Sequence, residues 1–161
     1  MKIKQVILSK SYTGFYFDDQ KAIKAGAGHD GFMYIGEPMT EKFSKVRQTG
    51  EAISIQLVLE DGSVGYGDCA AVQYSGAGGR DPLFLASEFI PFIEENIVPL
   101  LIGEDVTEFK SLAEKYDNLL VNGQRLHTAI RYGLTQALLN ASAVANKLTM
   151  AEVIRRDYGI E

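Results

Sequence analysis

An alternation of apolar and polar residues at positions 53–59, followed by Asp61-Gly62, restricts the fold of this 161-residue chain more than any other segment. Isoleucine or leucine occupies every second position from Ile53 to Leu59. A period of two is typical of a strand with one buried face, and Asp-Gly favours a two-residue hairpin loop. The segment therefore predicts a β-hairpin, and residues 3–8 form a plausible third strand.

A two-residue loop also predicts the register of this hairpin. It places Leu59 opposite Val64 and Leu57 opposite Tyr66, so that one apolar face is continuous across both strands. The glycines at positions 65 and 67 then line the other face. Because three strands with one apolar face need a covering layer, helices are expected to pack on that face.

Two helices are expected after residue 82. Asp81 followed by Pro82 is typical of an N-cap and a first helical position, which predicts a helix over residues 84–93 that Pro91 should kink or split. Thr107 is expected to cap a second helix with an apolar stripe at positions 109, 112, 116 and 119. Asn122-Gly123 is expected to end that helix.

Two further helices complete the predicted fold. Apolar residues recur every three or four positions over residues 124–146, and Thr149 with Glu152 has the spacing of a capping box for a short helix that ends at Tyr158-Gly159. Strands over about residues 1–70 and helices over about 82–158 predict an α+β fold, with a three-stranded antiparallel meander followed by a helical bundle. The length suits a single domain over residues 1–161.

Composition argues against several classes of protein. A net charge of −5 without a dense Lys/Arg face argues against a nucleic-acid binder. The longest apolar stretch, residues 89–102, is interrupted by prolines and glutamates and is not expected to span a membrane. The first residues lack the apolar run of a signal peptide, and the single Cys69 agrees with a reducing compartment. A cytoplasmic location is therefore expected.

The glycine pattern from Gly26 to Gly31 matches the dinucleotide-binding fingerprint letter for letter. That fingerprint works only between a strand and the N-terminus of a helix, whereas this segment follows charged residues and precedes an apolar run that favours a strand or turn. A surface loop is the preferred interpretation. Nucleotide binding stays a weaker alternative that titration would test.

A second glycine cluster, Gly76 to Gly79, lies between the predicted hairpin and the first predicted helix. The cluster lacks the lysine and Ser/Thr of a P-loop, and the Asp81 carboxylate would compete with a phosphate for the helix end. Glycines also allow a loop to open and close over a ligand, and Gln73, Tyr74 and Ser75 could contact a small polar molecule. A ligand-contacting loop and an ordinary connector remain equal alternatives.

The remaining reactive side chains suggest no acid–base pair. His29 and His127 are the only histidines, and packing or helix capping is the expected role of His127. Cys69 has no evident base beside it, and no spacing typical of metal ligands occurs. Asp18 and Asp19 are expected to lie in a solvated turn, and Asp68 is expected at the end of a strand, so none of these acidic residues needs a catalytic role. We therefore expect neither a catalytic residue nor a metal ligand in this chain.

Five segments together resemble the methylaspartate ammonia-lyase family of the enolase superfamily. They are residues 14–20 (GFYFDDQ), 26–32 (GAGHDGF), 67–82 (GDCAAVQYSGAGGRDP), 125–133 (RLHTAIRYG) and 149–155 (TMAEVIR). The resemblance covers essentially the whole chain, and the sixteen residues from 67 to 82 make it specific. It implies an amino-terminal α+β capping domain, which in this family precedes a carboxy-terminal (β/α) barrel that is expected to be absent from this chain.

The resemblance also implies an activity, the reversible elimination of ammonia from (2S,3S)-3-methylaspartate to give mesaconate. In that family the bases and the Mg²⁺ ligands belong to the barrel, with K⁺ as a second expected cofactor. The isolated chain is therefore expected to be inactive. Gln73 matches the family glutamine that lies beside the bound amino acid and is the one expected substrate-binding residue.

The resemblance implies partners as well. They are the barrel, in the same chain or as a separate one, a small amino-acid substrate, and a second copy in a homodimer. Whether the chain is a split-gene subunit or a fragment stays open. The alternative function is a stand-alone module that binds small ligands and has lost catalysis.

Overall fold

The computed structural model describes residues 1–71 and 81–160 and has a three-stranded antiparallel sheet at its centre. The strands are β1 (Ile3–Asp18), β4 (Arg47–Leu59) and β5 (Val64–Ala70), in the order β1-β4-β5. The antiparallel sheet with its packed helices confirms the predicted α+β fold, and the strand order is that of the predicted meander. β1 is longer than the predicted strand at residues 3–8, because its pairing with β4 continues as far as Asp18 and Arg47.

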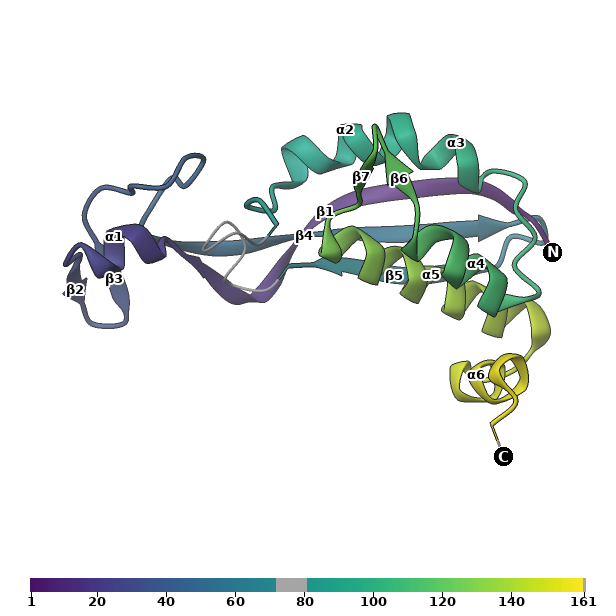
Figure 1. Cartoon of the computed structure of the whole chain (residues 1–161). Helices are drawn as coiled ribbons and strands as arrows, with labels where there is room; N and C mark the ends of the chain where they lie inside the picture. Colours follow the sequence, from purple (N-terminus) through teal and green to yellow (C-terminus); the bar gives the residue numbers. More distant parts are fainter. Residues whose placement is uncertain (72–80, 161) are drawn as a thin grey trace.

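The chain between β1 and β4 forms a small projecting unit, which we call the tip (residues 19–46). It contains α1 (Gln20–Lys24) and a hairpin of β2 (Gly28–Asp30) and β3 (Met33–Ile35). Figure 1 shows the tip beyond the ends of β1 and β4, away from the larger helices. The glycine pattern at residues 26–31 thus lies in an exposed hairpin and not at the N-terminus of a helix.

The prediction that Asp18 and Asp19 form a solvated turn is wrong, because both are buried. Arg47 donates two hydrogen bonds of 2.7 Å to the Asp18 carboxylate. Asp19 accepts hydrogen bonds from the backbone amides of Met39 and Thr40, the Thr40 hydroxyl and the first turn of α1. A buried charge is tolerated when such partners replace the lost water, so these carboxylates organise the tip.

The β4–β5 hairpin has a different register from the predicted one. The Leu59 amide donates to the Ser63 carbonyl at 2.8 Å, which leaves residues 60–62 as a three-residue loop. Gly62 has a φ of 85°, as such loops require. A shift of one residue exchanges the two faces of a strand. Gly65 and Gly67 are therefore buried, and Tyr66 is exposed.

The close approach of α5 (Thr128–Asn146) explains why glycines lie on the buried face of β5. A Cβ atom on Gly67 would lie 2.2 Å from the Gly133 carbonyl oxygen, and one on Gly65 would lie 2.6 Å from the Cβ of Ala141. No side chain larger than hydrogen fits at these contacts unless the backbone moves. The alternating pattern alone did not reveal this helix–strand contact.

The free edge of β5 is also covered by α5. Side-chain oxygens of Gln136 and Asn140 accept hydrogen bonds from the backbone amides of Asp68 and Tyr66, at 3.0 and 2.8 Å. These bonds satisfy amides that would otherwise be open to pairing with another chain.

The first two helices after the sheet are α2 (Ala86–Asn96) and α3 (Val98–Leu101), which lie along β1 in Figure 1. The predicted start at Asp81 is wrong, since α2 begins at Ala86 and its first amide donates to the Glu51 carboxylate on β4 at 2.7 Å. The break between the helices falls after Asn96 and not at Pro91, which lies inside α2. Pro99 lies in the first turn of α3, where a proline costs little.

The next helix, α4 (Phe109–Asp117), is followed by a hairpin of β6 (Leu120–Val121) and β7 (Gln124–Arg125). Asn122 and Gly123 have φ values of 52° and 76° and form the turn, so their expected role as a helix stop is wrong. This hairpin also moves the start of the third predicted helix from residue 124 to Thr128. The expected Thr107 cap is replaced by Asp157, which accepts from the first amide of α4 at 2.7 Å.

The last helix, α6 (Met150–Tyr158), has the predicted capping box of Thr149 and Glu152 and the predicted end at Gly159. One hydrophobic core joins the buried face of the sheet to α2, α4, α5 and α6. Within the described residues, no helix has the length and apolar composition that crossing a bilayer requires.

Candidate functional site

The segment predicted to contact a ligand, with Gln73 and the glycines from 76 to 79, lies outside the described residues. The structure describes both flanks of this segment. On one side, Ala71 is buried directly after β5. On the other side, the chain resumes at Asp81, which lies near the N-terminus of α5. These flanks and the surrounding residues define the candidate site.

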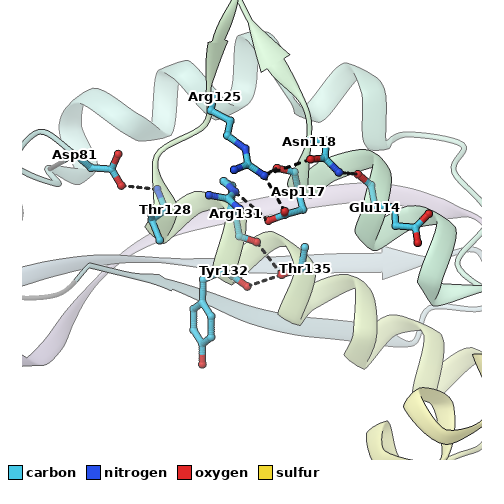
Figure 2. Close-up of polar contacts among 9 residues, drawn as sticks. All are labelled: Asp81, Glu114, Asp117, Asn118, Arg125, Thr128, Arg131, Tyr132 and Thr135. Carbon is cyan, nitrogen blue, oxygen red and sulfur yellow. Dashed lines mark hydrogen bonds and ion pairs between the residues drawn. The ribbon is translucent and has the colours of Figure 1, made fainter. Parts of the chain in front are cut away.

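The Asp81–Pro82 flank is bound to the start of α5. The Thr128 amide donates to the Asp81 carboxylate at 2.8 Å, which Figure 2 shows as a dashed line, and the His127 Nε2 atom lies 3.0 Å from the Pro82 carbonyl oxygen. Burial raises the pKa of Asp81, but hydrogen bonds from Thr128 outweigh it and leave the pKa below its usual value. Asp81 is therefore a carboxylate, and it stabilises the N-terminus of α5 instead of the N-terminus of α2.

His127 is the N-cap of α5, which confirms the expected role in packing or capping. Its Nδ1 atom accepts a hydrogen bond from the Ala129 amide at 3.0 Å. Nδ1 is therefore without a proton, and Nε2 carries the proton that is donated to Pro82. The ring packs against Phe84 and Phe89 at centroid distances of 5.0 and 5.2 Å. Burial lowers the pKa of His127, although the Pro82 hydrogen bond and the Asp81 charge oppose this effect.

The ring of His127 is consequently neutral and has both nitrogens engaged. A general acid or base needs a nitrogen that can reach the reacting proton. His127 therefore holds Pro82 and the start of α5 in place and does not transfer protons in this arrangement. His29, the other histidine, lies on exposed β2 in the tip beside Tyr34, with 4.5 Å between the ring centroids.

A cluster around Asp117 fixes the β6–β7 hairpin against α5 (Figure 2). Arg131 donates from Nε and Nη2 to the Asp117 Oδ1 atom at 2.9 and 2.6 Å. Arg125 donates from Nη2 to Asp117 Oδ2 at 3.1 Å and to Asn118 Oδ1 at 3.2 Å. The sequence analysis missed this cluster, because an aspartate and an arginine fourteen positions apart show no local pattern.

The hairpin and α2 enclose a pocket of about 300 Å³ beside the described flank of the Gln73 segment. Its lining includes Asp81, Pro82, Phe89, Phe92, Val121, Asn122, Gln124, Arg125, Leu126 and His127. The polar groups of Asp81 and His127 are already hydrogen-bonded within the protein. Among the described residues that line it, the pocket thus offers aromatic contact, and the Asp81 carboxylate and the His127 ring are held by hydrogen bonds within the protein.

The other reactive side chains fit a structural role. Cys69 is buried on β5, and burial raises the pKa of its thiol to about 12, which keeps it protonated at neutral pH. Asp68 lies exposed on the same strand. Within residues 1–71 and 81–160, no three His, Cys, Asp or Glu side chains are grouped so that they could hold a metal ion. The described residues therefore do not fit a Mg²⁺ site.

Comparison with protein families identifies a match over nearly the whole chain. The family described as Methylaspartate ammonia-lyase N-terminus matches residues 1–159. A curated relative, Methylaspartate ammonia-lyase of Clostridium tetanomorphum, is 66% identical over 158 residues, which are 98% of this chain and 38% of that protein. The chain thus spans less than two-fifths of the length of this relative.

Solved structures show the same similarity in three dimensions. The Mg complex of β-methylaspartase from Clostridium tetanomorphum is 65% identical with a TM-score of 0.96, over 99% of this chain and 38% of that one. Citrobacter amalonaticus methylaspartate ammonia lyase containing (2S,3S)-3-methylaspartic acid is 57% identical with a TM-score of 0.96, over 100% and 39%. A distant neighbour, the L-Ala-D/L-Glu epimerase of Bacillus subtilis, shares the fold at 15% identity, with a TM-score of 0.50 over 91% of this chain and 32% of that one.

Proposed function

Because this chain belongs to the methylaspartate ammonia-lyase N-terminal family, we propose that it is the capping domain of an enzyme that reversibly eliminates ammonia from (2S,3S)-3-methylaspartate to give mesaconate. The observation that carries the proposal is 66% identity over 98% of the chain with a relative of that name. The presence of (2S,3S)-3-methylaspartic acid in the Citrobacter amalonaticus structure supports the choice of substrate.

The described residues support a division of labour between this chain and the rest of the enzyme. The reaction needs a base that removes a proton beside a carboxylate and an electrophile that stabilises the resulting enolate. His127 has both nitrogens engaged, and Cys69 is buried with its pKa raised to about 12. We propose that the base, Mg²⁺ and K⁺ belong to a carboxy-terminal barrel, as the family resemblance implies; the Mg complex of the Clostridium tetanomorphum β-methylaspartase supports Mg²⁺ in the complete enzyme.

The proposed contribution of this chain is to shape the pocket and exclude water. An active site closed by loops strengthens electrostatic interactions and prevents side reactions. The hydrogen bonds that His127 and Thr128 make with Pro82 and Asp81 support this role, because they fix the described flank that follows the Gln73 segment in sequence. Gln73 itself is proposed to bind the amino group of the substrate, for which a carboxamide has both donor and acceptor atoms.

The activity of the complete protein tests the proposed function. We define the complete protein as this chain followed by the remaining part of the Clostridium tetanomorphum relative. The complete protein should release ammonia from 3-methylaspartate and form mesaconate, whereas the purified 161-residue chain should do neither and should not bind Mg²⁺ specifically. Ammonia release by the pure chain would contradict the division of labour. Binding of 3-methylaspartate by the chain alone, without turnover of the complete protein, would favour the stand-alone binding module.

Gln73→Ala in the complete protein tests the substrate contact. Removing the carboxamide should slow ammonia release and enlarge the pocket, so that larger amines add to mesaconate better than before. Gln5→Ala is a matched control, because Gln5 is exposed on β1. Kinetics with ammonia and methylamine, together with melting curves, separate the outcomes. If Gln73→Ala keeps the wild-type rates for both amines, Gln73 does not line the pocket. If its melting temperature falls along with its activity, the role of Gln73 is structural.

The proposed partners follow from the same family membership. The barrel is expected in the same polypeptide, because the relatives contain this segment as about 38% of one chain. We also propose that the complete enzyme is a homodimer, and light scattering of the complete protein would test its mass.

A further inference from the structure

The pocket between the β6–β7 hairpin and α2 has an aromatic wall that the proposed function does not use. Phe89 and Phe92 lie on α2, where both are half-buried against the core and line the pocket. The Phe89 ring stacks on Phe84 at 4.8 Å between centroids and meets Phe92 edge-on at 6.3 Å. It also meets the buried His127 ring edge-on at 5.2 Å. The wall is therefore held in place by aromatic contacts within the protein.

Two side chains of opposite charge line the same pocket, and both retain hydrogen-bonding capacity. A carboxylate can accept about four hydrogen bonds, and the Thr128 amide uses one of those of Asp81 at 2.8 Å. All hydrogen bonds from Arg125 to described residues come from Nη2, so these residues leave its Nε and Nη1 donors unused. Asp117 and Asn118 hold the guanidinium through Nη2, and Figure 2 shows both contacts.

We propose that this pocket binds a small α-amino acid, as the zwitterion, whose side chain is apolar. Arg125 binds the carboxylate of the ligand, because guanidinium donors match the geometry of carboxylate oxygens. Asp81 accepts hydrogen bonds from the ammonium group, which the faces of the aromatic rings also attract. Phe89 and Phe92 contact the apolar side chain of the ligand. The inference does not depend on the proposed function, because it uses only described residues of this chain.

The charge and the size of the pocket favour this ligand over other classes. The charges of Asp81 and Arg125 cancel, so a ligand with a single charge leaves one of the two side chains without a partner. A volume of about 300 Å³ is at the lower end of the range for small-molecule sites, which is too small for a nucleotide. 3-Methylaspartate carries a second carboxylate, which would lose its water against the aromatic wall. The substrate of the proposed lyase is therefore not the ligand expected here.

Titration of the 161-residue chain, followed by NMR, tests the inference. L-Phenylalanine should bind saturably, with a Kd of about 1 mM or lower, and should shift the amide signals of Phe92, Leu126 and His127. 2-Phenylethylamine lacks the carboxylate and 3-phenylpropionate lacks the ammonium group. Each should bind at least about tenfold more weakly, because one charged hydrogen-bonding partner is lost. No saturable binding of L-phenylalanine, equal binding of either analogue, or shifts confined to the tip would overturn the inference.

Two substitutions test the charged residues separately. Asp81→Asn keeps a side-chain oxygen for the Thr128 amide and removes the negative charge, and Arg125→Gln removes the guanidinium. Each should weaken the binding of L-phenylalanine at least about tenfold. Wild-type affinity in either variant would overturn the inference. Melting curves are recorded for both variants, and if Arg125→Gln unfolds, Asp81→Asn and the ligand series still decide.

Matched controls make the result specific. Asp30→Asn on β2 and Arg155→Gln on α6 change exposed charges outside the pocket and should bind L-phenylalanine like the wild type. A tenfold loss in these controls would show that net charge, and not the pocket, determines binding, and the inference would fail. 3-Methylaspartate should bind at least about tenfold more weakly than L-phenylalanine. Tighter binding of 3-methylaspartate would overturn the ligand class and favour the stand-alone binding module.

Discussion

Asp19 lies fully buried at the start of the tip, where its carboxylate accepts hydrogen bonds from two separate stretches of backbone. Burial raises its pKa, but hydrogen bonds from Thr40, Met39 and Ala22 outweigh it and leave the pKa below the ordinary value. Asp19 therefore remains a carboxylate at neutral pH, and its oxygens replace the water that the tip excludes.

Asp19→Ala should destabilise the tip strongly. Each buried amide that loses its acceptor costs about 1–3 kcal/mol, so a total loss of roughly 3 kcal/mol is expected. Asp30→Ala, at an exposed position on β2, is the matched control and should change the stability by about half a kcal/mol or less. Urea denaturation and proteolysis within the tip measure the effect. Similar curves for the two variants would show that the Asp19 hydrogen bonds contribute little.

Protonation of His127 is expected to make the stability of the fold depend on pH. Its folded pKa is below the unfolded value of about 6.5, because the ring is buried in the neutral form. The unfolded chain therefore binds a proton more readily, and the stability due to this group is complete above the unfolded pKa. That stability should be lost as the pH falls from the unfolded pKa through the folded one.

Denaturation at pH 7.5 and pH 5.5 tests this expectation. The wild-type chain should be less stable at the lower pH, and His127→Asn, which keeps a capping side chain, should reduce that difference. His29→Asn is the control, because His29 lies exposed on β2. An unchanged pH dependence in His127→Asn would mean that other groups cause it.

At the scale of elements, the contact of α5 with β5 determines how the sheet is covered. The backbones approach so closely that a Cβ atom on Gly67 would lie 2.5 Å from the Ala137 nitrogen. Gly67→Ala should therefore force the helix away from the strand and cost about 3 kcal/mol, the upper end of the range for overpacked cores. Gly14→Ala is the control, since no other group lies within 4 Å of a Cβ built there. Thermal melts that do not distinguish the two variants would contradict the contact.

At the scale of the whole molecule, one core joins the sheet to the helices, whereas the tip lies outside it apart from Phe43. We expect native-state hydrogen exchange to separate these parts. Amides of the central strand β4, such as those of Ile53 and Ile55, should exchange only through global unfolding, and those of β2 and β3 through local opening at lower denaturant. Equal opening free energies for β3 and β4 would show that the tip folds together with the core.

Features that depend on residues close together in the sequence were predictable from the sequence. The strand at residues 53–59 follows from side-chain alternation, and the capping box follows from the spacing of Thr149 and Glu152. The capping role of His127 was also foreseen, because it begins an amphipathic segment. The sixteen-residue run from 67 to 82, which contains Gln73, predicted family membership, although the contact of Gln73 with substrate remains a prediction.

Features with causes far apart in the chain required the tertiary structure. The register of β5 depends on α5, whose Gly133 and Ala137 leave room only for glycine on the facing strand. Asp81 was predicted to cap the helix after residue 82 but accepts from the start of α5, and the contact of Glu51 with the start of α2 was not predicted. Both errors have the same cause, because a carboxylate caps whichever helix the fold brings to it. Local propensity acts through neighbouring residues, but packing and charge compensation depend on distance in space, and only the folded chain establishes that distance.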